Sequence, residues 1–179
     1  MTDDAALLAA LAAIQERGAI GESSLERAIE HADHFVTNLP PDTGSIADLG
    51  SGGGLPGLVI AVRRPDVRLV LVERRATRAD LLHRAVAALE LTDRVEVFAD
   101  DVALLAKRSP AAFDAVTARS FAAPPITIRW AGALLRVGGV LVVAEPPNDD
   151  PSRWPVDVLR RHGLVDQGRH QAVRVFRRC

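Results

Sequence analysis

The chain has 179 residues, of which 48% are hydrophobic and 25% charged. This composition is typical of one globular domain that is large enough to form a core without disulfides or metals. The net charge of −1 excludes a general attraction to polyanions, and the single cysteine, Cys179, excludes a disulfide framework or cysteine metal site, so we expect no metal.

Two helices are expected before the first strand. Apolar residues at helical spacing predict one helix over residues 3–17, and Ser24 is a candidate N-cap for a second helix that ends near Leu39. A proline- and glycine-rich break at residues 40–44 follows. The residues expected to face inward are Leu7, Leu8, Leu11 and Ile14 in the first helix and Ile29, Ala32 and Val36 in the second.

The N-terminus carries Asp3 and Asp4 before its apolar run and therefore lacks the basic region of a signal peptide. No apolar run approaches the roughly 20 residues of a membrane span. We therefore expect a cytoplasmic protein without a membrane partner.

After residue 44, apolar strand-like segments alternate with helical ones. Such alternation predicts right-handed crossovers and a mostly parallel sheet with both faces covered by helices. The expected strands are 46–49, 68–72, 95–98, 114–118 and 140–144, and the expected helices are 56–63, 77–90, 101–107 and 125–135.

The C-terminal segment has a different pattern. A helix over residues 154–162 should end at Gly163, and two short apolar runs then flank a polar turn at Gln167 and Gly168. Two strands so closely joined must be antiparallel. We therefore predict an α/β fold with a Rossmann-like sheet of five parallel strands plus a C-terminal antiparallel hairpin. Residues 1–44 are expected to form a helical segment that packs on a domain spanning residues 45–179.

A glycine-rich turn follows the first strand, which ends near Asp48. A phosphate-binding NTPase loop is excluded because leucine and proline stand where it needs lysine and serine or threonine. A dinucleotide loop stays open, since residues 52–57 match its glycine pattern, although Pro56 leaves fewer free N–H groups for a pyrophosphate. S-adenosylmethionine is favoured because Asp48 can accept hydrogen bonds from its ammonium group; a turn without a ligand is the remaining alternative.

A second acid, Glu73, ends the second strand. In βαβ units an acid at this position commonly binds the hydroxyls of a ribose. Asp48 and Glu73 together therefore indicate a site for an adenosine-containing ligand at the carboxyl ends of parallel strands.

Three segments resemble the glucose-inhibited division protein B family: Asp48-Leu-Gly-Ser-Gly-Gly-Gly-Leu-Pro-Gly57, Arg64-Pro-Asp66 and Phe113-Asp-Ala-Val-Thr-Ala-Arg119. The resemblance extends over residues 31–145. Members of that family are class I methyltransferases that use S-adenosylmethionine to methylate N7 of a guanine in 16S ribosomal RNA. The resemblance implies this cofactor for the chain, with ribosomal RNA or the small ribosomal subunit as partner.

The resemblance also implies site residues. It places the ribose on Glu73 and the adenine near residues 101–103, and it makes His31 and Arg119 the candidate catalytic residues. The complete set of expected cofactor contacts is Asp48, Gly50, Ser51, Gly52, Gly54, Leu55, Glu73, Asp101, Val102, Ala103 and Arg119.

Three positions depart from the family pattern. Its asparagine-leucine-threonine segment is not recognisable before His31, Ala103 replaces a glutamate, and Glu145 stands where the fifth strand usually ends in lysine. A carboxylate at that position is expected to disfavour an RNA phosphate.

Transfer to guanine N7 needs no general base, because N7 carries a free lone pair. An oxygen or amine acceptor would benefit from one, and His31 or His34 would then be the candidate. The alternatives to an RNA methyltransferase are a methyltransferase of small molecules or other nucleobases, a non-catalytic S-adenosylmethionine-binding module and, more weakly, a nicotinamide-dependent reductase. We expect solvated arginines at 74, 75 and 78 and in the C-terminal segment, and core positions for Phe121, Trp130 and Trp154.

Overall fold

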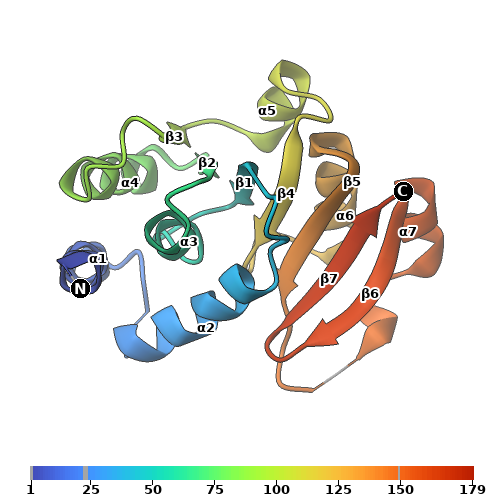
Figure 1. The fold of residues 1–179 in the computed structure, drawn as a ribbon, viewed down its shortest axis with the longest axis horizontal. Coiled ribbons are helices and arrows are strands. Elements are labelled where there is room, and N and C mark those ends of the chain that lie inside the picture. Colours follow the sequence, from blue (N-terminus) through green and yellow to red (C-terminus); the bar gives the residue numbers. More distant parts are fainter. Residues whose placement is uncertain (1, 22–23, 149) are drawn as a thin grey trace.

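The computed structural model describes residues 2–21, 24–148 and 150–179. One seven-stranded sheet runs through the molecule in the order β3-β2-β1-β4-β5-β7-β6 (Figure 1). The strands are β1 Ser45–Leu49, β2 Arg68–Val72, β3 Val95–Phe98, β4 Phe113–Ala118, β5 Leu135–Ala144, β6 Leu164–His170 and β7 Val173–Arg178.

The first five strands are parallel and β6 and β7 form an antiparallel hairpin, which confirms the expected fold class. β7 pairs antiparallel with β5, so the hairpin extends the same sheet. From β1 the chain builds outward to β2 and β3, and it then returns to the other side of β1 with β4. Such a reversal of strand order opens a crevice at the carboxyl ends of the strands.

Helices cover both faces of the sheet (Figure 1). Two hydrophobic clusters, one on each face, receive α1–α4 and α5–α7 respectively. No helix in the described residues is long and apolar enough to cross a membrane. The helices are α1 Thr2–Gln15, α2 Leu25–Thr37, α3 Gly57–Arg63, α4 Ala76–Ala88, α5 Val102–Arg108, α6 Pro124–Leu134 and α7 Val156–Arg161, with a short 3-10 turn, η1, at Pro151–Arg153.

The start of α2 follows the expected capping. The Ser24 hydroxyl accepts a hydrogen bond from the backbone N–H of Arg27. Ala32 is buried as expected, but Ile29 and Val36 are only partly buried, and the centre of the buried face includes Phe35. The inward face is therefore rotated relative to the expectation, because the aromatic ring offers the larger apolar surface for burial.

The expected turn at Gln167 and Gly168 is wrong. β6 continues to His170, and the chain reverses at Gln171, whose φ is 56°. Gly168, with φ 95°, lies instead at a register shift in the β6–β7 pairing, where its N–H donates to Asp166 Oδ1 at 2.8 Å. The sequence misled here because a glycine with positive φ serves a bulge as well as a turn.

Candidate active site

Two adjoining cavities lie at the carboxyl edge of the sheet. The β2 cavity, of about 460 Å³, is lined by Glu73 and Asp101 among others. The β5 cavity, of about 340 Å³, is lined by residues that include His31 and Arg119. The turn after β4, Ser120-Phe-Ala122, contributes to the walls of both cavities. The site therefore has two compartments that meet at one turn.

The glycine loop is fastened to the end of β2. The Ser51 N–H donates to the Val72 carbonyl at 3.0 Å. Glu73 accepts hydrogen bonds from the N–H groups of Gly52 at 3.0 Å and Arg75 at 2.8 Å. Glu73 therefore holds the glycine loop in position and also lines the β2 cavity.

Gly50 is required by its surroundings as well as by its φ of 66°. A Cβ at this position would lie 2.9 Å from Cδ2 of Phe121, which is closer than real Cβ contacts allow. The Phe121 ring thus lies against the glycine loop at the junction of the two cavities. Phe121 is partly buried and packs against the hydrophobic cluster on the α5–α7 face of the sheet, so the packing role predicted for it is confirmed, and it lines both cavities as well.

Asp48 lies beneath the loop. Its side chain is buried, Oδ1 accepts a hydrogen bond from the Thr117 hydroxyl at 2.7 Å, and Oδ2 has no hydrogen-bond partner among the described atoms. Burial raises its pKa to about 6, although the hydrogen bond from Thr117, the nearby Ser51 and Gly57 and the charge of Arg119 favour the ionised form. The residue sits beside Gly57 at the start of α3 and lines neither cavity.

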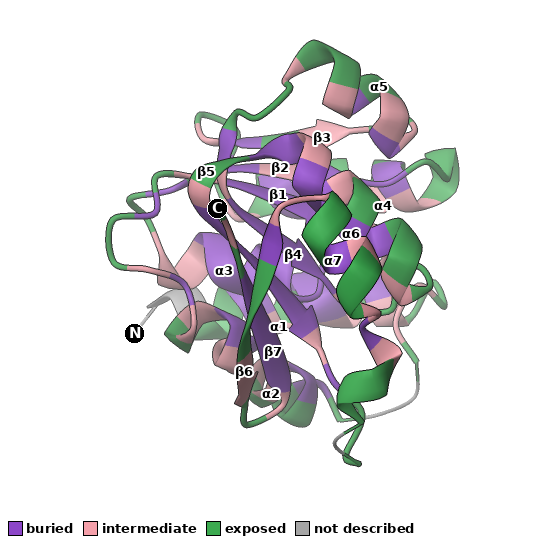
Figure 2. Ribbon diagram, turned by 90° about the vertical axis from the view of Figure 1, so that its right-hand side faces the viewer, coloured by how far each residue is buried: buried purple, intermediate pink, exposed green. Residues whose placement is uncertain are grey.

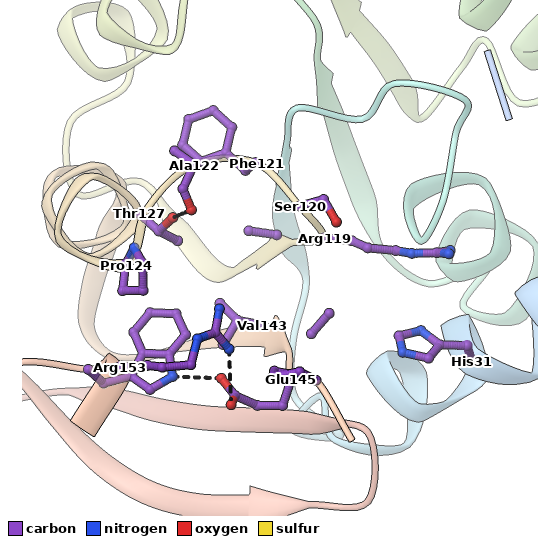
Figure 3. Close-up of a pocket in the computed structure, with 14 residues that line it drawn as sticks. His31, Arg119, Ser120, Phe121, Ala122, Pro124, Thr127, Val143, Glu145 and Arg153 are labelled. Atoms are coloured by element: carbon purple, nitrogen blue, oxygen red, sulfur yellow. Dashed lines mark hydrogen bonds and ion pairs between the residues drawn. The ribbon is translucent and has the colours of Figure 1, made fainter. Parts of the chain in front are cut away.

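Arg119 and His31 converge on the β5 cavity from β4 and α2 (Figure 3). Arg119 Nη1 and His31 Nδ1 are buried and lack a hydrogen-bond partner in the described part of the chain. Burial lowers the pKa of His31, and the positive charge of Arg119 and the nearby His34 lower it further. Unpartnered polar atoms are costly in a protein interior, so they indicate a place for a polar ligand.

Asp114, on the strand that precedes Arg119, forms no ion pair with it. Asp114 lies at the opposite end of β4 and pairs with Arg136. Asp114 Oδ2 also accepts hydrogen bonds from the N–H groups of Gly44 at 2.9 Å and Ser45 at 2.7 Å. It therefore joins the starts of β1 and β4 and takes no part in the candidate site.

Glu145 lines the β5 cavity but is not a free carboxylate. It accepts hydrogen bonds from Trp154 Nε1 at 2.6 Å and Arg153 Nη1 at 3.2 Å (Figure 3). Arg153 therefore compensates the charge of Glu145, and the effect of this carboxylate on an RNA phosphate stays a prediction. Trp154 is buried and packs against Phe176 at 4.9 Å between ring centroids, which confirms the core position predicted for it.

The expected site residues divide into two groups. Gly50, Glu73, Asp101 and Val102 line the β2 cavity, and His31 and Arg119 line the β5 cavity. The second group lines neither cavity and consists of Asp48, Ser51, Gly52, Gly54, Leu55 and Ala103. A role in cofactor binding stays a prediction for both groups.

Sequence reasoning missed much of the wall opposite the glycine loop. The segment after β4 supplies it, and Trp130, predicted to be a core residue, is partly exposed and lines the β2 cavity. This segment follows the carboxyl end of β4, beside the point where the strand order reverses, and that position alone could have indicated a ligand site. The wall residues that the sequence did not indicate include Ser120, Ala122, Ile126, Thr127 and Arg153.

Within the described ranges, no group of three or more histidine, cysteine, aspartate or glutamate side chains is placed to hold a metal ion. The ionisable side chains that line the two cavities carry carboxylate, guanidinium and imidazole groups.

Comparison with known proteins gives consistent results. "Ribosomal RNA small subunit methyltransferase G" of Rubrobacter xylanophilus is 36% identical over 64% of this chain and 44% of its own length. The protein of the same name from Leifsonia xyli is 42% identical over 72% of this chain and 61% of its own length. The chain thus spans about half the length of the curated relatives that it matches.

Solved structures share the fold. An O-methyltransferase from Bacillus cereus, in complex with SAH, superposes with a TM-score of 0.61 at 16% identity, covering 96% of this chain and 88% of its own. A model of the family described as "rRNA small subunit methyltransferase G" (GidB) matches residues 11–148. Because that match covers most of the sequence, the chain belongs to the GidB family of rRNA small subunit methyltransferase G proteins.

Proposed function

We propose that the chain is an S-adenosylmethionine-dependent methyltransferase that acts on N7 of a guanine in 16S ribosomal RNA. One observation carries this proposal: two adjoining cavities meet at the turn after β4, one containing Glu73 and the other the unpartnered nitrogens of Arg119 and His31. The relatives named for ribosomal RNA methylation support the choice of substrate. Such a substrate implies a cytoplasmic enzyme.

The residues fit this cofactor. Glu73 is a buried carboxylate on the wall of the β2 cavity, where ribose hydroxyls can donate to it. Asp101 and Val102 line the same cavity, where the adenine would lie. The remaining part of the cofactor would extend past Gly50 toward the β5 cavity, which we propose as the place of the acceptor base.

The reaction needs orientation more than acid–base chemistry. S-adenosylmethionine supplies a methyl group on a sulfonium, and its carbon–sulfur bond breaks as the bond to N7 forms. Because N7 has a free lone pair, no side chain has to remove a proton. The lowered pKa of His31 keeps its imidazole neutral at pH 7, so it acts as a hydrogen-bond partner, while Arg119 provides the positive charge of the cavity. Both residues would position the acceptor.

The first test is binding. Calorimetry should detect binding of S-adenosylhomocysteine and no binding of NADH.

The second test is activity. The variant Arg119→Gln should transfer the methyl group at least about tenfold more slowly than the wild type, because the acceptor loses its positioning contact. Methylation is measured as transfer of a tritiated methyl group to small-subunit RNA from a strain that lacks this modification. Arg84→Gln removes an exposed arginine on α4 and serves as the matched control, with no expected effect.

The outcomes separate the alternatives. Binding of NADH without S-adenosylhomocysteine would contradict methyltransferase activity. Binding of S-adenosylhomocysteine without label in RNA at any stage of subunit assembly would exclude the RNA substrate and favour a small-molecule methyltransferase or a non-catalytic binding module.

A further inference from the structure

A third cavity, of about 490 Å³, lies between α6, α7 and the end of β7. Its wall carries the basic side chains of Arg129, Arg161, His162 and Arg178, and no aspartate or glutamate is among its lining residues. We call these four residues the α6–α7 basic site. Figure 2 shows α6 and α7 side by side, with exposed residues on their outer faces.

In the described part of the chain, no aspartate or glutamate side chain compensates the charges of this site. Among the described residues, no acidic side chain forms an ion pair with Arg129, Arg161 or Arg178. Arg129 and Arg161 are exposed. Burial lowers the pKa of His162, and the positive charges of Arg161 and Arg129, which line the same cavity, lower it further. Like charges gathered around one hollow favour a bound anion.

Other arginines of the C-terminal segment are engaged differently. Arg174 is buried and forms an ion pair with Asp166 at 2.8 Å. Arg177 donates to the Gly138 carbonyl at 3.3 Å, and Arg178 donates to the Leu135 carbonyl. Arg161 makes no side-chain hydrogen bond within the described part of the chain. Among the residues that line this cavity, the available charge is therefore concentrated at Arg129 and Arg161, and Arg178 forms part of the wall.

The α6–α7 basic site adjoins the β2 cavity at one residue. Trp130 lines both the β2 cavity and the basic cavity. The Arg129 guanidinium lies 4.8 Å from the Trp130 ring centroid, and Ile126, one turn earlier, is 49% exposed on the wall of the β2 cavity. A partly exposed tryptophan beside an arginine is a combination that binds unpaired bases and the backbone between them.

We propose that the α6–α7 basic site binds the phosphate backbone of the RNA whose target base enters the β5 cavity, with the exposed face of α6 as the path between them. This inference rests on the RNA substrate proposed above. Helix α6 has 11 residues and is therefore roughly 16 Å long, so the phosphates bound here would lie a few nucleotides from the target base. A single-stranded or irregular RNA segment fits this path best, because its bases can reach Trp130.

The test uses the variant Arg129→Gln/Arg161→Gln in the full chain. Its affinity for a small-subunit RNA fragment is measured by fluorescence anisotropy from about 50 to 200 mM salt. We expect at least about tenfold weaker binding and a salt slope lower by about 2, since each lost phosphate contact removes about one unit. Arg68→Gln/Arg84→Gln removes the same charge from exposed positions at the start of β2 and on α4, and it should bind like the wild type.

Calorimetry with S-adenosylhomocysteine checks that the double variant remains folded, because its affinity should not change. If the variant binds RNA with the affinity and salt slope of the control, the docking inference is overturned while the RNA substrate stands. If the wild type itself shows no RNA affinity, the substrate proposal fails and the inference fails with it. A changed sedimentation coefficient with unchanged RNA affinity would make this face a protein interface instead and would also overturn it.

Discussion

At the scale of single residues, the two acids expected to bind the cofactor have different environments. Glu73 faces a cavity and uses backbone N–H groups to fix the glycine loop. Asp48 is buried under that loop with one oxygen unpartnered, close enough to Arg119 for their charges to interact. A buried carboxylate that is incompletely hydrogen bonded lowers stability, which is a common property of functional sites.

Asp48→Asn should change how stability depends on pH. The pKa of Asp48 rises on folding from 3.8 to about 6, so the folded state holds the proton more tightly, and this contribution to stability is lost as pH rises from 4 to 6. The loss amounts to at most about 3 kcal/mol. As pH rises from 4 to 8, the wild type should therefore lose stability relative to the Asp48→Asn variant. Urea denaturation of both proteins measures this difference in the free energy of unfolding.

Asp114→Asn is the control for this experiment. Burial acts to raise the pKa of Asp114, but Arg136 and the N–H groups of Gly44 and Ser45 outweigh it and lower the pKa to about 2. Asp114 in the folded protein therefore titrates below pH 4. The Asp114→Asn variant should have a lower free energy of unfolding than the wild type, and this difference should stay constant between pH 4 and 8. Parallel curves for Asp48→Asn and the wild type would show that Asp48 does not titrate as described.

At the scale of elements, the connection that follows α1 contacts the glycine loop directly. An added Cβ at Gly53 would lie 2.3 Å from Cγ1 of Ile20 and 2.8 Å from the Ala19 carbonyl oxygen. The connection after α1 therefore covers the outer side of the loop. Element positions followed from local periodicity, whereas this contact joins segments that are distant in the sequence.

Gly53→Ala should destabilise the protein by about 1–3 kcal/mol, because backbone atoms of the connection must move. Gly21→Ala is the matched control, since a Cβ at Gly21 meets nothing within 4 Å and should cause no loss. Chemical denaturation measures both. Equal stability of Gly53→Ala and Gly21→Ala would mean that the segment after α1 does not pack against the glycine loop.

At the scale of the whole molecule, two hydrophobic clusters share one sheet. Leu11 of α1 belongs to the cluster on one face and Leu134 of α6 to the cluster on the other, and both side chains are fully buried. Strand β1 contributes Ile46 to the first cluster and Leu49 to the second. We therefore propose that residues 1–44 are an integral layer of the domain formed with residues 45–179.

Leu11→Ala and Leu134→Ala should each lower the free energy of unfolding by about 2–5 kcal/mol. Both should unfold in one transition, with the same midpoint by circular dichroism and by tryptophan fluorescence, because both tryptophans lie on the face opposite Leu11. An early loss of helix in Leu11→Ala, with the fluorescence midpoint unchanged, would instead make the N-terminal helices a separate unit.

The amino-acid sequence by itself determined the alternation of strands and helices, the glycine loop after β1 and the acid at the end of β2. These features depend on side-chain periodicity and on backbone conformations that neighbouring residues set. Only the tertiary structure decided that β7 lies between β5 and β6, that Arg153 neutralises Glu145, and that α6, α7 and β7 gather unpaired arginines around one hollow. Each of these depends on contacts between distant segments, whose pairing is selected by the packing of the complete sheet and cannot be read from local sequence pattern.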